Sequence, residues 1–140
     1  MKNTITEIKQ ITASETIQIR HKVMWPNKLI EYVALPNDEN GRHFGLFVNG
    51  QITSIISIFT EGNEVQFRKF ATLIEFQGLG YGTVLLEKII DLIKKEGVRR
   101  LWCNARVEKS NFYKRFKLKP TDEIFKKDGI EYVIMEHYFY

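Results

Sequence analysis

The spacing of apolar and polar residues divides the chain into strands and helices. Alternation of the two predicts strands at residues 5–11, 43–48, 51–60, 65–73, 99–106, 122–127 and 131–138. Apolar residues three and four positions apart predict a helix over residues 83–96, with shorter helical stretches over 14–23 and 111–116. The dipeptides Asn49-Gly50 and Asp128-Gly129 predict hairpin turns between neighbouring strands.

This order of elements predicts a mixed sheet. An antiparallel meander comes first, then one strand–helix–strand crossover, which must be right-handed and join parallel strands, and then a closing hairpin. The expected fold class is therefore α/β (an α+β mixed sheet), mostly antiparallel and flanked by helices. At 140 residues, the chain is expected to form a single domain, residues 1–140. Within residues 65–73, alternation sends Phe67 and Lys69 to one face of the sheet, and Arg68 and Phe70 to the other.

The composition and charge of the chain disfavour several classes of protein. Hydrophobic residues make up 44% and charged residues 27%, as in globular proteins, and no apolar run is long enough for a membrane span. The net charge of +4 comes from interspersed residues without a recognition motif, so no nucleic-acid partner is expected. The single cysteine, Cys103, excludes an internal disulfide and favours a cytoplasmic location. No cluster has metal-ligand spacing, so no metal is expected.

Three glycines at alternate positions, Gly78, Gly80 and Gly82, connect a predicted strand to the longest predicted helix. The first N–H groups of a helix lack internal partners and carry partial positive charge, so this loop is suited to a pyrophosphate. A tight turn without a ligand is the alternative. No lysine follows Gly82, which excludes a P-loop, and the spacing and position of the glycines disfavour a dinucleotide fold.

The glycine loop and its surroundings resemble the Gcn5-related N-acetyltransferase (GNAT) family. Gln77, Gly80 and Gly82 match that family's motif Gln/Arg-x-x-Gly-x-Gly/Ala. Phe70-Ala71-Thr72 stands where the family has an upstream strand, and residues 104–116 are similar to its last conserved block. The resemblance covers the whole chain in element order, and it implies acetyl-CoA as co-substrate.

The resemblance also implies where coenzyme A would bind. Backbone N–H groups of the loop would hold the pyrophosphate: Gly78, Leu79, Gly80, Tyr81, Gly82 and Thr83. The backbone of Phe70, Ala71 and Thr72 would pair with the pantetheine arm, in a splayed gap between this strand and the next parallel strand. The family's asparagine is replaced here by Arg106, so a side-chain contact to the coenzyme would fall to Arg106 or to Asn104.

Tyr113 occupies the position of the family's general acid, which protonates the departing thiolate. A phenol can donate a proton to a thiolate leaving group, because the two groups have similar basicity, and a packing role in the short helix is the alternative. The general base stays open among several residues that no spacing singles out: Glu31, Glu64, Glu75, His43 and His137. Cys103 is disfavoured as a nucleophile, because alternation places it in the core.

The resulting expectation is an N-acetyltransferase that moves an acetyl group directly to a primary amine of a small molecule or peptide, within a ternary complex. A non-catalytic acyl-CoA-binding or regulatory module on the same fold is the alternative. No membrane partner is expected. A homodimer is left open by the aromatic C-terminal residues Tyr138-Phe139-Tyr140.

Overall fold

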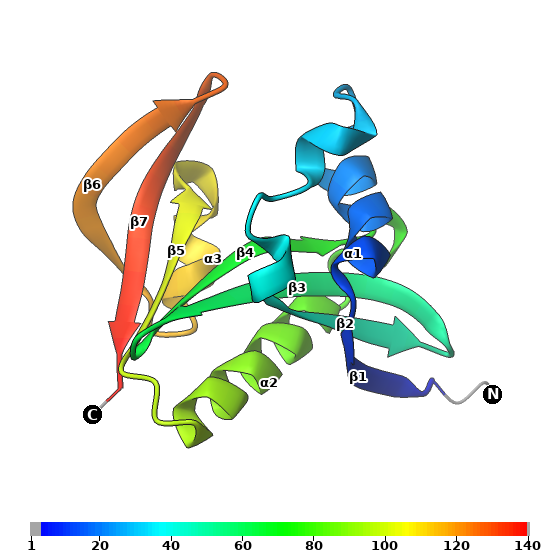
Figure 1. Cartoon of the computed structure of the whole chain (residues 1–140), viewed down its shortest axis with the longest axis horizontal. Helices are drawn as coiled ribbons and strands as arrows, with labels where there is room; N and C mark the ends of the chain where they lie inside the picture. Colours follow the sequence, from blue (N-terminus) through cyan, green and yellow to red (C-terminus); the bar gives the residue numbers. More distant parts are fainter. Residues whose placement is uncertain (1–3, 140) are drawn as a thin grey trace.

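A computed structural model describes residues 4–139 of the chain, arranged around one mixed sheet (Figure 1). The sheet has seven strands in the order β1-β2-β3-β4-β5-β7-β6. The strands are β1 Thr6–Ile11, β2 Arg42–Val48, β3 Gln51–Glu61, β4 Glu64–Thr72, β5 Arg100–Arg106, β6 Lys119–Lys127 and β7 Ile130–Tyr138. The helices are α1 Ala13–Ile19, continued by a π-helical turn η1 Arg20–Met24, then α2 Tyr81–Lys95 and α3 Ser110–Lys114. Short 3-10 turns are η2 Ile30–Val33, η3 Asp38–Asn40, η4 Ile74–Phe76 and η5 Val107–Lys109.

The sheet contains one parallel pair, β4 and β5, and the other neighbouring strands are antiparallel, which confirms the predicted fold class. The parallel pairing is short, because it runs only from Glu64 opposite Arg100 to Gln66 opposite Trp102. Beyond that point β4 continues to Thr72 and β5 to Arg106 without pairing with each other, and the two strands diverge (Figure 1). The sheet is therefore open between the distal halves of β4 and β5.

A β-bulge in β4 changes which residues share a face. Ser57 pairs with Arg68, but Ile55 pairs with Ala71, so β4 carries an extra residue here, and Lys69 has a positive φ of 55°. The bulge brings Phe70 to the same face as Phe67, with ring centroids 6.3 Å apart. The prediction that alternation separates these two rings was therefore wrong, because one inserted residue reverses the faces beyond it.

The helices cover opposite faces of the sheet, α1 above and α2 below in Figure 1. Helix α2 packs its apolar stripe against β-strand residues such as Ile56 and Phe67, whereas α1 packs Ile19 against Ile55 and Ala71. Between residues 4 and 139, no helix is long and apolar enough to cross a membrane. The larger core thus lies beneath the α2 face, next to the opening between β4 and β5.

Candidate functional site

The glycine loop ends at the N-terminus of α2, and it presents bare backbone amides there. Gly78 and Gly80 have φ of 78° and 88°, a region that glycine enters without a Cβ penalty. Gly80 is the N-cap, and the first helical bond runs from the Val84 N–H to the Gly80 carbonyl. The backbone N–H groups of residues 78–83 donate to no acceptor within residues 4–139. Together with the helix dipole, they form a site for an anion.

The loop is held against the end of β4. A Cβ on Gly82 would lie 3.2 Å from Thr72 Oγ1 and 3.3 Å from Phe70 Cζ, so any larger residue would require these side chains to shift by a few tenths of an ångström. The Gln77 side-chain amide donates to the Thr72 carbonyl at 2.9 Å. Both contacts bring the loop residues and Phe70, Ala71 and Thr72 together, although they are separate motifs in the sequence.

Tyr113 lies beside the same stretch of β4. Its ring centroid is 5.7 Å from that of Phe67 and 6.5 Å from that of Phe70. Burial raises the pKa of Tyr113, the nearby Cys103 adds to the rise, and the charge of Arg106 acts against it. The hydroxyl has no hydrogen-bond partner in the described part of the chain. The structure thus presents a protonated phenol with a free donor next to the opening between β4 and β5.

Asn104 and Arg106 lie on the face of β5 opposite the buried Cys103 and Ala105. Asn104 is exposed on β5. The Arg106 guanidinium lies 5.9 Å from the centroid of the Trp25 ring, which places it on the η1 side of the sheet. Cys103 points the other way, into the core, and burial raises the pKa of its thiol. A buried, protonated thiol is a poor nucleophile.

None of the candidate bases is set apart by its surroundings. His43 is buried, with Nδ1 2.7 Å from Ser57 Oγ and Nε2 2.9 Å from the Asp38 carbonyl, so both ring nitrogens are occupied. Glu64 pairs with Arg100 at 3.1 Å. In the described chain, no group of three His, Cys, Asp or Glu side chains is placed to hold a metal ion.

Arg20 is a buried cation that the sequence did not reveal, since it lies within an otherwise apolar helical stripe. Its guanidinium donates to both Asp38 carboxylate oxygens at 2.8 and 2.9 Å, to Ser57 Oγ at 3.0 Å and to the Val33 carbonyl at 3.1 Å. Burial alone would raise the pKa of Asp38, but hydrogen bonds from Arg20 and the Leu35 N–H lower it. This network fixes η1 and η3 to β3, beside the bulge.

Arg115 adds positive charge near the glycine loop. Its Nη2 lies 3.3 Å from Thr83 Oγ1, and its guanidinium lies 4.8 Å from the centroid of the Phe112 ring. The sequence did not reveal this contact of Arg115, because nothing in the spacing connects the end of α3 to the start of α2.

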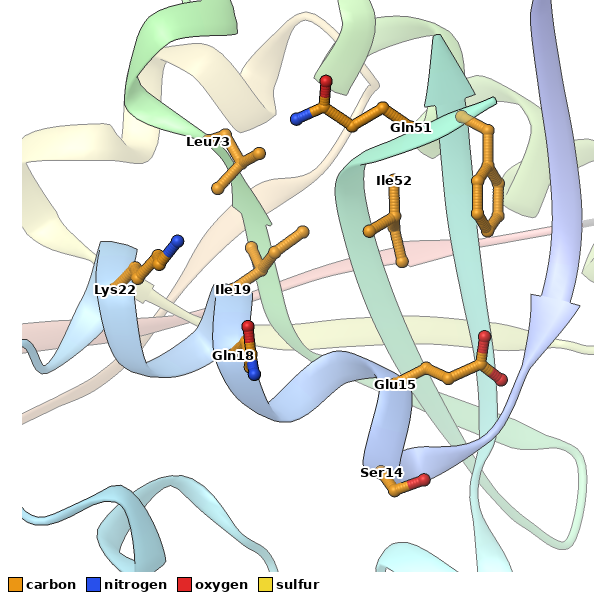
Figure 2. Close-up of a pocket in the computed structure, with 9 residues that line it drawn as sticks. Ser14, Glu15, Gln18, Ile19, Lys22, Gln51, Ile52 and Leu73 are labelled. Atoms are coloured by element: carbon orange, nitrogen blue, oxygen red, sulfur yellow. The ribbon is translucent and has the colours of Figure 1, made fainter. Parts of the chain in front are cut away.

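A cavity of about 390 Å³ lies on the α1 face of the sheet (Figure 2). Figure 2 shows Ile19, Ile52 and Leu73 in its apolar part. Its polar side chains are Ser14, Glu15, Gln18, Lys22 and Gln51. None of the predicted site residues lines this cavity, so it is separate from the glycine loop and Tyr113.

A comparison with known protein families identifies the family to which the chain belongs. A model of the acetyltransferase (GNAT) domain matches residues 8–139. The chain belongs to the GNAT acetyltransferase family. The resemblance of the glycine loop is thereby confirmed at the level of the family.

Individual members of the GNAT family are similar to the chain in sequence and fold. The uncharacterized N-acetyltransferase YitI of Bacillus subtilis is 30% identical over 133 residues, which cover 89% of each chain. The structure of the ribosomal-protein-S18-alanine N-acetyltransferase of Escherichia coli superposes with a TM-score of 0.80 and 21% identity, covering 94% of this chain and 92% of that one. A GNAT acetyltransferase of Elizabethkingia anophelis with acetyl-CoA bound gives a TM-score of 0.75 and 16% identity, covering 96% and 98%.

Proposed function

We propose that this chain is an acetyl-CoA-dependent N-acetyltransferase, working as one domain over residues 1–140, which transfers acetyl directly to a primary amine of a small molecule or peptide. The observation that carries the proposal is the row of free amides at residues 78–83, fixed to β4 where the sheet opens beside Tyr113. Membership of the GNAT family supports the reaction type. The alanine N-acetyltransferase of Escherichia coli supports including peptide ends among the acceptors.

The chain's own groups fit coenzyme A. The amides of residues 78–83 would hold the pyrophosphate, and Arg115 would add a positive charge at the same end of α2. The backbone of residues 70–72 would pair with the pantetheine arm in the opening between β4 and β5. The acetyl-CoA bound to the Elizabethkingia anophelis protein supports this choice of ligand. Of the two residues left open for a side-chain contact, we favour Asn104, which is exposed on β5, because Arg106 lies over the Trp25 ring.

Tyr113 would act as the general acid. The amine nitrogen forms a bond to the acetyl carbon, the carbon–sulfur bond breaks, and the Tyr113 hydroxyl donates its proton to the departing sulfur while the amine releases one to water. Because burial raises the pKa of Tyr113, the hydroxyl keeps its proton at neutral pH. Its free donor makes it available for this step.

Two measurements on one preparation test the proposal against a non-catalytic acyl-CoA-binding module. Calorimetric titration with acetyl-CoA, with NAD as the control ligand, tests binding. Release of the coenzyme thiol in the presence of a broad panel of primary amines then tests turnover. We expect binding of acetyl-CoA alone and turnover with some amines. Binding without turnover of any amine would identify the module instead, and absence of binding would overturn both.

A further inference from the structure

The bulge in β4 gathers positive charge on the α1 face of the sheet. Arg68 lies opposite Ser57, which is bonded to the buried Arg20. Lys69, the next residue, is turned toward the same face, where the charges of Arg68, Arg20 and Lys127 act on it. Alternation without a bulge would have placed Lys69 on the α2 face. Two consecutive cations of β4 and Lys127, the last residue of β6, therefore lie near one another.

Arg68 and Lys69 make no ion pair of their own, and the one carboxylate whose charge acts on both of them, Asp38, is bound by Arg20. Arg42 and Arg100 are each paired with a carboxylate, and Asp38 is already paired with Arg20. The side chains of Arg68, Lys69 and Lys127, by contrast, make no ion pair or hydrogen bond with any residue from 4 to 139.

Burial makes this lack of partners costly. Arg68 and Lys69 are half-buried, and burial lowers the pKa of Arg68 and lowers that of Lys69 to about 8. Beside them, the Nε of the buried Arg20 has no acceptor either. Half-buried cations without partners are unfavourable, which points to an anion supplied from outside the chain.

The cationic cluster of Arg68, Lys69 and Lys127 is next to the expected reaction centre, on the side of the sheet away from α2. Lys69 precedes Phe70, whose ring lies 6.5 Å from that of Tyr113. Arg106, whose charge reaches Tyr113, lies over Trp25, and Trp25 contacts Tyr32 edge-on at 5.3 Å. The Tyr32 hydroxyl donates to Asp128, which follows Lys127 in the turn between β6 and β7. η1 packs against β4, and the Tyr32–Asp128 hydrogen bond connects η2 to the turn that follows Lys127. These segments lie on the α1 side of the sheet, whereas the glycine loop begins α2 on the opposite face (Figure 1).

We propose that the acceptor amine carries an anionic group, a carboxylate or a phosphate, which binds Arg68, Lys69 and Lys127. The inference rests on the proposed acetyltransferase function and assigns the substrate class of its acceptor side. Nearby cations also disfavour the ammonium form of the acceptor, so they lower the pKa of its amine and help supply the neutral nucleophile. This effect is consistent with the absence of a distinct base among the described residues. Polyamines and strongly basic peptides are disfavoured as acceptors, because like charges repel.

Matched pairs of acceptors test the proposal with the full-length protein. β-Alanine is compared with β-alaninamide, and O-phosphoethanolamine with ethanolamine, at saturating acetyl-CoA and constant ionic strength. We expect kcat/KM to be at least tenfold higher for the anionic member of one or both pairs, and the pair that responds tells carboxylate from phosphate. Thermal shift with each anionic compound in the presence of coenzyme A gives a binding measurement that needs no turnover.

Two variants and one control connect the preference to the cluster. R68Q and K69M are each expected to raise KM for the anionic acceptor at least tenfold, while the KM for acetyl-CoA stays the same. K95Q removes the same charge from α2 on the other face and should keep the wild-type preference.

Each outcome decides the proposal. Equal or better turnover of the neutral members, or a preference that survives both cluster variants, would overturn the inference and leave the acetyltransferase function standing. Neither turnover nor binding of the anionic members would also overturn it. If acetyl-CoA itself fails to bind, the proposed function is overturned as well.

Discussion

Tyr113 and Cys103 lie close together beside the opening of the sheet, and burial raises the pKa of both side chains. The consequence differs for the two groups. A phenol that stays protonated remains able to donate a proton, whereas a thiol that stays protonated is a poor nucleophile. The same environment therefore keeps Tyr113 in the protonated form that a general acid needs, although it weakens the driving force for proton transfer, and it disfavours Cys103 as the site of a covalent intermediate.

Removing the Tyr113 hydroxyl should slow the chemical step alone. We expect Y113F to lower kcat by about 10²-fold or more, which is the usual size of a general-acid contribution, while KM for acetyl-CoA stays unchanged. Because the hydroxyl has no hydrogen-bond partner among residues 4–139, unfolding free energy should change by less than about 0.5 kcal/mol. Steady-state kinetics and urea denaturation check both points, and an unaltered kcat would remove the acid assignment.

Replacing Cys103 tests whether the acetyl group passes directly to the amine, without a covalent intermediate on the enzyme. We expect C103A to keep turnover, because the thiol forms no bond to the acetyl group, and to lose about 1 kcal/mol of stability from the lost packing. Mass spectrometry after mixing with acetyl-CoA should find no acetylated enzyme. Complete loss of turnover in this variant, with the fold intact, would favour a covalent route instead.

Helix α2 has a glycine with positive φ at each end, and only one of them faces the expected ligand. Gly80 has φ of 88° at the N-cap, and Gly97 has φ of 79° just beyond the C-terminus. No heavy atom lies within 4 Å of a Cβ built at either position. Substitutions at Gly80 and Gly97 therefore distinguish the effect of backbone strain on stability from an effect on ligand binding.

Alanine at these two positions should have the same effect on stability and different effects on binding. We expect G80A and G97A each to lose about 1–2 kcal/mol of unfolding free energy, the cost of a left-handed conformation for a residue with a Cβ. Only G80A should weaken acetyl-CoA, by about tenfold or more, because it shifts the amides that hold the pyrophosphate. Calorimetric titration measures the affinities, and equal affinities would contradict the role of the loop.

The ion pair between Arg20 and Asp38 should matter far more than an exposed pair of similar geometry. We expect D38N to cost about 3–5 kcal/mol, because it leaves a buried guanidinium uncompensated. E96Q breaks the exposed pair with Arg42 and should cost less than about 1 kcal/mol. Urea denaturation measures both. Since the pKa of Asp38 is lowered, its contribution is complete above the ordinary carboxyl pKa and is lost as pH falls through the folded value.

At the scale of secondary-structure elements, the sequence predicted the strands and the long helix but not the irregularities within them. Periodicity predicted the strands, the long helix and the parallel crossover, because each follows from local spacing of apolar residues. The bulge at Lys69 could not be predicted, since an inserted residue leaves no mark in alternation, and so Phe70 was placed on the wrong face. The partner of Arg20 was equally hidden, because Asp38 reaches it only in the folded chain.

At the scale of the whole molecule, the cluster of Arg68, Lys69 and Lys127 lowers the stability of the folded state and forms the proposed binding surface. Lys69 faces Arg68, Arg20 and Lys127, with Asp38 as the opposing charge, and its pKa is lowered from 10.5 to about 8. A lysine whose folded pKa is lowered disfavours the folded state while it is protonated. Between pH 8 and 10.5 the unfolded chain binds more protons, so stability from this group rises with pH and is level below pH 8.

Replacing Lys69 should therefore stabilise the protein at neutral pH. We expect K69M to raise the unfolding free energy at pH 7 by on the order of 1 kcal/mol, after solvent screening is allowed for, and the gain to disappear as pH approaches the ordinary lysine pKa. Urea denaturation across this pH range measures it, with K95M on α2 as the control. A gain that does not depend on pH would point to packing and not to charge.

A structure of the protein with coenzyme A tests the central claim most directly. We expect the pyrophosphate oxygens within hydrogen-bond distance of backbone amides in residues 78–83, and the pantetheine arm between the diverging halves of β4 and β5. A coenzyme bound elsewhere, with these amides bonded to the protein itself, would contradict the claim.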